Sequence, residues 1–192
     1  MNVIFLDFDG VINSAYYKDL KGTEEKIKIL AEICKKYNCK VVISAAAKNA
    51  IDEKTLEIDE ECEWVKSVFE LFKKYGIECI GRTPNVIKRL STSSYIMIWK
   101  EDEIRLYLFR HPEIEHFCVI DDDTINPQSS DLNKLREYLV KTEFYTEKGT
   151  DEGLLEEHSS QVGEILKKDN KIRKLALKRK TFTNQIVKEP TY

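Results

Sequence analysis

The chain lacks the features that mark membrane and secreted proteins. None of its apolar runs is long enough to span a bilayer, and its N-terminus has neither a basic stretch nor a cleavage site of small residues. We therefore expect no transmembrane segment and a cytoplasmic location. Internal repeats and low-complexity linkers are also missing, so a length of 192 residues indicates one domain with room for an appendage.

Cysteine pairs with metal-binding or redox spacing are missing as well. The number of cysteines is odd and no two of them form a CxxC motif: Cys34, Cys39, Cys62, Cys79 and Cys118. Scattered thiols of this kind are typical of reduced core residues in cytosolic proteins. Their spacing argues against a zinc site.

Charge is unevenly distributed along the chain. The formal net charge is −3, yet residues 167–180 contain a single acid, Asp169, among these basic residues: Lys167, Lys168, Lys171, Arg173, Lys174, Lys178, Arg179 and Lys180. We therefore divide the chain into an acidic folded domain at residues 1–166 and a basic C-terminal extension at residues 167–192. The extension is either a solvated helix or a contact for anionic lipid, nucleic acid or an acidic partner.

Short apolar runs alternate with segments of helical periodicity. The apolar runs are residues 3–6, 40–44, 77–81, 117–121 and about 138–144, and the helical segments are about 23–37, 60–75 and 100–110. This alternation predicts an α/β fold with a central, mainly parallel sheet flanked by helices. Ligands of such sheets bind beyond the carboxyl ends of the strands, where Asp7, Ser44 and Asp121 fall.

Two carboxylates follow the first apolar run. Asp7 and Asp9 are two residues apart, so on an extended chain they project the same way, and Gly10 then allows a sharp turn. Two like charges held this close are unfavourable unless a cation lies between them. The pair therefore predicts a site for a divalent metal ion.

Three more polar motifs lie where predicted strands or helices begin or end. Ser44 precedes a predicted helix start at Ala45-Ala46-Ala47-Lys48, where its hydroxyl and free N–H groups would bind phosphate. Lys100 opens a predicted helix, and Asp121 and Asp122 end a predicted strand.

Each of these three motifs also has a simpler structural explanation. Ser44 would serve equally as a helix N-cap. Lys100 would equally be a surface lysine, in which case Lys88 or Arg89 would bind the phosphate. Asp122 and Asp123 would equally be turn formers.

Taken in order, the acid pair, hydroxyl, lysine and acid cluster resemble the four motifs of the haloacid dehalogenase (HAD) superfamily. More narrowly, residues 1–166 resemble the HAD domains associated with Swiss Army Knife RNA-repair proteins, with further support from Gly81-Arg82-Thr83-Pro84 and from Lys141-Thr142 followed by Gly153-Leu154-Leu155. The resemblance implies a Rossmann-like core. The predicted elements between Asp9 and Lys100 leave little or no room for a cap domain, so we expect an open site for a bulky substrate.

The resemblance also implies a phosphatase that uses Mg²⁺ and an aspartyl-phosphate intermediate. Asp7 is the implied nucleophile and Asp9 the implied general acid and base. Ser44 and Lys100 would bind the phosphoryl oxygens. The implied metal ligands are Asp7, Asp9 through its backbone carbonyl, Asp121 and Asp122.

One stretch departs from related sequences, which follow the hydroxyl residue with another small polar residue and then a Trp-Arg pair. Here Ala45-Ala46-Ala47-Lys48 takes that place. Because lysine does not replace arginine as a bidentate donor, we expect substrate binding to be weaker or reshaped.

The substrate class follows from charge. The acidic domain favours a phosphorylated protein, including phosphotyrosine, because nucleic-acid binding needs a basic track. Tyr16 and Tyr17 would either stack on the substrate ring or pack within the flap. RNA or nucleotide ends are the alternative, which the RNA-repair association favours, and a non-catalytic phosphate- or partner-binding module is another.

Overall fold

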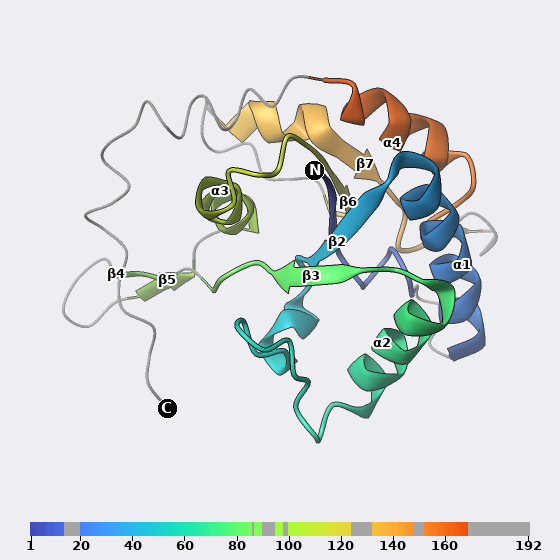
Figure 1. Cartoon of the computed structure of the whole chain (residues 1–192), viewed down its shortest axis with the longest axis horizontal. Coiled ribbons are helices and arrows are strands. Elements are labelled where there is room, and N and C mark those ends of the chain that lie inside the picture. Colours follow the sequence, from blue (N-terminus) through green and yellow to red (C-terminus); the bar gives the residue numbers. More distant parts are fainter. Residues whose placement is uncertain are drawn as a thin grey trace.

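Five parallel strands form the main sheet, in the order β3-β2-β1-β6-β7 (Figure 1). Their bounds are β1 (Asn2–Leu6), β2 (Cys39–Ile43), β3 (Cys79–Arg82), β6 (His116–Asp121) and β7 (Leu139–Lys141). The computed structural model describes residues 1–13, 20–85, 87–89, 95–97, 100–123, 132–147 and 152–168. The predicted α/β fold with a parallel sheet is confirmed.

Helices cover both faces of this sheet. Helices α1 (Leu20–Tyr37), α2 (Glu63–Tyr75) and α4 (His158–Leu166) lie on one side, and α3 (Lys100–Arg110) lies on the other (Figure 1). Two short 3₁₀ helices, η1 (Ala46–Ala50) and η2 (Leu132–Tyr138), follow β2 and precede β7. The three helices predicted from periodicity are confirmed.

A second, two-stranded antiparallel sheet lies between β3 and α3 in the chain. It consists of β4 (Ile87–Arg89) and β5 (Tyr95–Met97), and it is separate from the main sheet (Figure 1). An insertion this small agrees with the predicted absence of a large cap domain.

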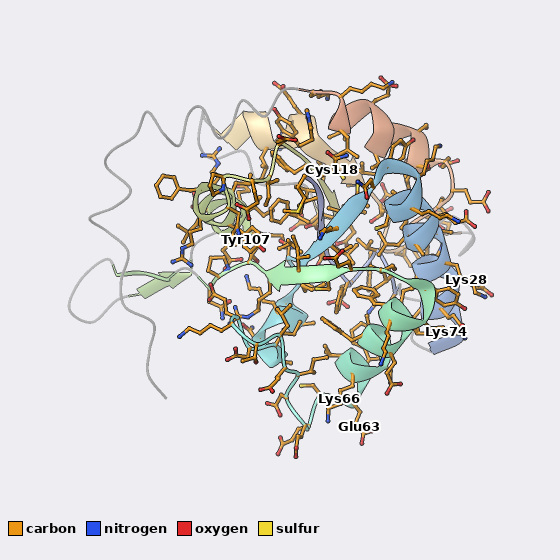
Figure 2. All side chains as sticks on the ribbon, viewed as in Figure 1. Lys28, Glu63, Lys66, Lys74, Tyr107 and Cys118 are labelled. Atoms are coloured by element: carbon orange, nitrogen blue, oxygen red, sulfur yellow. The ribbon has the colours of Figure 1, made fainter. Side chains whose placement is uncertain are left out.

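The core is built around β1, the central strand. Val3, Ile4, Phe5 and Leu6 are fully buried, because parallel neighbours flank the strand and helices cover both of its faces. The Phe5 ring meets the edge of Tyr107, which Figure 2 shows on α3, with ring centroids 5.7 Å apart. These contacts hold β1 rigidly, and with it the acidic residues that follow.

The described cysteines are free thiols, and most of them are in the core. Cys34, Cys39 and Cys118 are buried, and Cys118 lies within the sheet (Figure 2). Burial raises the pKa of Cys34 and that of Cys39 to about 12. Thiols held this far from ionisation act as small apolar side chains.

Some sequence predictions fall on residues outside the described part of the chain. Tyr16 and Tyr17 lie there, and so does the basic extension beyond Lys168. The division at residue 166 therefore stays a prediction. No helix within the described ranges has the length and apolarity needed to cross a membrane.

The first residue of α4 makes the stability of the fold depend on pH. His158 is buried, and its Nδ1 accepts a hydrogen bond of 2.9 Å from the Leu155 N–H. Burial lowers the pKa of His158 below 6.5, Lys26 lowers it further, and Glu157 opposes both. The neutral ring therefore stabilises the fold above pH 6.5, and this contribution is lost as the pH falls from 6.5 through the folded-state pKa.

We expect His158→Asn to reduce this pH dependence, because the amide oxygen can accept the same hydrogen bond without titrating. The wild-type chain should lose about 1 kcal/mol more unfolding free energy than the variant between pH 7.5 and pH 5. Thermal unfolding of both proteins across this range measures the difference. If the stabilities of the two proteins fall in parallel as the pH is lowered, titratable groups other than His158 cause the acid sensitivity.

Candidate active site

A row of buried polar residues crosses the carboxyl edge of the sheet. Leu6 pairs with Ile43 on one side and Ile120 on the other, so the next residues, which are Asp7, Ser44 and Asp121, lie at one level. Backbone bonds continue the row at both ends, because the Thr83 N–H donates to Ile43 and the Thr142 N–H to Asp121. The row therefore runs Thr83, Ser44, Asp7, Asp121 and Thr142.

The centre of the row is also the switch point of the fold. The chain adds β2 and β3 on one side of β1, and then adds β6 and β7 on the other. Crevices open at such points outside the carboxyl ends of the strands. Asp7 and Asp121 occupy the two strand ends that flank this position.

Three carboxylates gather there. Asp7, Asp121 and Asp122 each offer one oxygen, and these oxygens lie within 4.8 Å of one another. Burial and the charge of Asp121 raise the pKa of Asp7, Lys100 opposes them, and the resulting pKa is about 7. Burial and the charge of Asp121 also raise the pKa of Asp122. The crowding is the arrangement that a cation relieves.

Lys100 provides one positive charge in this cluster. Its Nζ lies 3.0 Å from Asp7 Oδ2 and 2.7 Å from Asp121 Oδ2. Although burial opposes it, the two carboxylates together raise the pKa of Lys100 above its ordinary value. Three carboxylates and one ammonium leave a deficit of two positive charges when all are ionised, which matches a divalent cation.

Asp9 points its carboxylate to a different partner. Its side chain is exposed, and Oδ1 accepts a 2.8 Å hydrogen bond from Asn13 Nδ2. The Asn13 Oδ1 atom in turn accepts from the Gly10 N–H at 3.1 Å. The Asp9 carboxylate is therefore not part of the three-carboxylate cluster.

Ser44 follows β2 and carries an unsatisfied hydroxyl. The residue is 1% exposed, and its Oγ has no hydrogen-bond partner among the described residues. The helix that follows is the 3₁₀ helix η1, whose N-cap is Ala45 with no side-chain bond. The N-cap alternative for Ser44 is therefore wrong. A buried hydroxyl without a partner is costly, and a bound ligand oxygen would satisfy it.

Lys48 marks the stretch in which the sequence departs from related ones. It is buried on η1, where its ammonium forms an ion pair with Glu103 of α3 and donates to Thr83 Oγ1 at 3.3 Å. Burial lowers the pKa of Lys48, and Glu103 offsets much of this effect. The ammonium of Lys48 is thus neutralised by Glu103 inside the protein. This ion pair connects the loop after Ser44 to the first turn of α3.

The remaining alternatives concern Lys88, Arg89 and the residues after Asp121. Lys88 and Arg89 lie on β4, whereas Lys100 contacts Asp7 directly. The side chain of Asp121 closes the turn after β6, because its Oδ1 accepts a hydrogen bond of 3.0 Å from the Asp123 N–H. This bond orients the Asp121 carboxylate within the cluster, so turn formation and ligand placement act together.

The sequence-based reading predicts none of the contacts that four residues make at the site: Thr83, Thr142, Lys48 and Glu103. The two threonines share a signal, since each directly follows a strand and is buried. No such signal identifies Lys48 and Glu103, because their pairing depends on how α3 packs.

Comparison with known proteins identifies the family. A family model described as the HAD domain in Swiss Army Knife RNA repair proteins matches residues 3–152, a range that includes every residue of the site described above. Curated proteins and solved structures gave no match.

Proposed function

Because the chain belongs to the family of HAD domains in Swiss Army Knife RNA repair proteins, we propose that it is a Mg²⁺-dependent phosphatase. One observation carries this proposal. Buried Asp7 lies at the switch point of the sheet, paired with Lys100 and next to the unsatisfied Ser44 hydroxyl. A nucleophile, a cation and a hydroxyl donor thus converge where a phosphoryl group could sit.

The donor set suits Mg²⁺. Carboxylate oxygens are the ligands that this hard cation prefers, and Asp7, Asp121 and Asp122 supply three of them, with the Asp9 carbonyl as the implied fourth. When bound, Mg²⁺ would offset the repulsion between these carboxylates and a phosphate group.

The chain's own residues account for the two chemical steps. A carboxylate oxygen of Asp7 attacks phosphorus, and the bond from phosphorus to the leaving oxygen breaks as Asp9 donates a proton to that oxygen. Asp9 then accepts a proton from the water that attacks the aspartyl-phosphate, which releases inorganic phosphate and regenerates Asp7. The exposed position of Asp9 supports this role, because the leaving group is the bulky part of the substrate.

Ser44 and Lys100 hold the phosphoryl oxygens. Charge spreads over these oxygens in the transition state, so a fixed ammonium and a fixed hydroxyl stabilise it. The backbone of Ser44 is held by the 2.8 Å hydrogen bond that its N–H donates to the Leu6 carbonyl, and the ammonium of Lys100 is held by its ion pairs with Asp7 and Asp121. Fixed donors of this kind need no reorganisation during the reaction.

RNA or nucleotide ends are the substrate class that we favour. The description of the family supports this choice. The small β4–β5 insertion is in keeping with an open site. The acidic charge of residues 1–166 favours a phosphoprotein instead, and the family description does not support that preference.

The decisive experiment is phosphate release from four substrates by the full chain, with Mg²⁺ and with EDTA. The substrates are p-nitrophenyl phosphate, oligoribonucleotides with a 5′- or a 3′-phosphate, and a phosphotyrosine peptide. We expect hydrolysis that EDTA abolishes, with a higher kcat/KM for one of the RNA ends than for the peptide. RNA binding should also weaken steeply with salt.

Two results would contradict the proposal. Faster hydrolysis of the peptide than of either RNA would show that the substrate is a phosphoprotein rather than an RNA end. No hydrolysis of any substrate, by folded protein that binds Mg²⁺, would leave a non-catalytic phosphate-binding module.

A further inference from the structure

Thr142 joins the two acidic loops of the site. It directly follows β7 and is fully buried. Its backbone N–H donates to the Asp121 carbonyl at 3.0 Å, and its Oγ1 donates to the Gly10 carbonyl at 2.6 Å. One residue therefore bonds both to the loop after β1 and to the end of β6.

The two loops that Thr142 joins lie in close contact. Gly10 has a φ of +69°, and a Cβ added there would lie 2.4 Å from the Cβ and Cγ of Asp122. Any side chain at this position would displace Asp122 or the loop. The absence of a side chain permits the close approach, but it does not fix the distance between the two backbones.

Other bonds hold the rest of the loop. The N–H groups of Val11, Ile12 and Asn13 all donate to the Phe8 carbonyl, which closes the turn on itself, and the Leu154 N–H donates to Val11. None of these bonds joins Gly10 to the β6 side of the site. Within the described part of the chain, the Thr142 hydroxyl makes that connection.

The orientation of the Asp9 carbonyl follows from the same contacts. In a trans peptide the carbonyl of Asp9 and the N–H of Gly10 point in opposite directions. Because this N–H donates to Asn13, the Asp9 carbonyl points away from Asn13. Thr142 restrains the next carbonyl along the chain, so Asn13 and Thr142 together hold the Asp9–Gly10 peptide.

We propose that Thr142 is a positioning residue that sets the affinity of the site for Mg²⁺. Its hydroxyl holds the Asp9–Gly10 backbone at a fixed distance from Asp121 and Asp122, whose carboxylates are implied ligands. This inference rests on the proposed function for the identity of the metal. Residues that orient metal ligands typically change affinity by about 10-fold to 100-fold when they are removed.

The test is a calorimetric titration of the full chain with Mg²⁺, comparing Thr142→Val with Thr142→Ser. Valine keeps the shape of threonine and loses the hydroxyl, whereas serine keeps the hydroxyl. We expect the valine variant to raise the Kd for Mg²⁺ about 10-fold and the serine variant to stay within about threefold of the wild type.

Thr23→Val is the matched control. Thr23 is also fully buried, and its Oγ1 has no partner among the described residues. It lies on α1 and supplies no atom to the acidic cluster, so the same substitution there changes a buried threonine outside that cluster. Its Kd for Mg²⁺ should equal that of the wild type.

The outcomes separate this proposal from the proposed function. A Thr142→Val variant with wild-type Kd overturns the positioning role, even where its Tm falls. If Thr142→Val does not fold, Thr142→Cys replaces it, because a thiol is a weak donor, and the same 10-fold change is expected. A wild-type chain that binds no Mg²⁺ overturns the inference, whereas one that binds Mg²⁺ but hydrolyses nothing overturns only the phosphatase.

Discussion

Replacing Asp7 by asparagine should lower kcat by about 10⁴-fold or more, to the limit of detection in a phosphate-release assay. The amide has the size of the carboxylate but cannot attack phosphorus, and it removes one oxygen ligand from the acidic cluster. We expect the largest loss of kcat at Asp7, because without a nucleophile no aspartyl-phosphate forms.

The fold should survive this change. Asparagine removes a negative charge from a buried position where Asp121 repels it, although it also removes a partner of Lys100. Glu61→Gln is a suitable control, since it removes an exposed carboxylate from the loop before α2. Turnover that persists in a folded Asp7→Asn protein would exclude Asp7 as the nucleophile.

Lys100→Met is expected to lower kcat by about 10²-fold to 10³-fold at saturating Mg²⁺. The methionine side chain keeps much of the apolar stem and loses the ammonium that lies within 3.0 Å of Asp7. Loss of a fixed charge that faces the transferring phosphoryl group weakens transition-state binding more than ground-state binding. Vanadate inhibition constants, measured beside kcat, report this loss directly.

Three further lysine or arginine variants complete this experiment. Lys73→Met removes an exposed charge on α2, away from the site, and should leave kcat unchanged. Lys88→Met and Arg89→Met test the alternative cations on β4. A larger loss in either of the last two than in Lys100→Met would assign the phosphate contact to β4.

The parts of the fold that sequence patterns predict are those with strong local signals. The run that ends at Leu6 is apolar at successive positions because a central parallel strand is buried on both faces. The helix predicted at residues 100–110 is observed with the same bounds as α3. Residues that end such elements, such as Asp7 and Asp121, are thereby placed at one edge of the sheet.

Other elements have no comparable local signal. Helix α4 covers only His158–Leu166, and the two strands of the β4–β5 pair have three residues each, so neither shows a sustained period. The helix expected after Ser44 is a 3₁₀ helix of five residues, because the chain becomes extended again at Ile51, which pairs with Ile58.

Contacts between side chains that are far apart in the sequence cannot be predicted from the sequence patterns. Lys48 and Glu103 are 55 positions apart, and a lysine that follows three alanines gives no sign that it is buried. The role of Thr142 likewise depends on where β7 lies relative to β1. Pairings of this kind are set by packing, whereas the spacing of motifs sets only which strand ends meet.

The pairing of β1 with β6 has a consequence for how the protein folds. Asn2–Leu6 aligns residue by residue with His116–Ile120, so strands from distant parts of the sequence lie side by side at the centre of the sheet. Contacts of such long range form late, because a large loop must close before they contribute. The repulsion of Asp7 by Asp121 therefore arises only once β1 and β6 have paired.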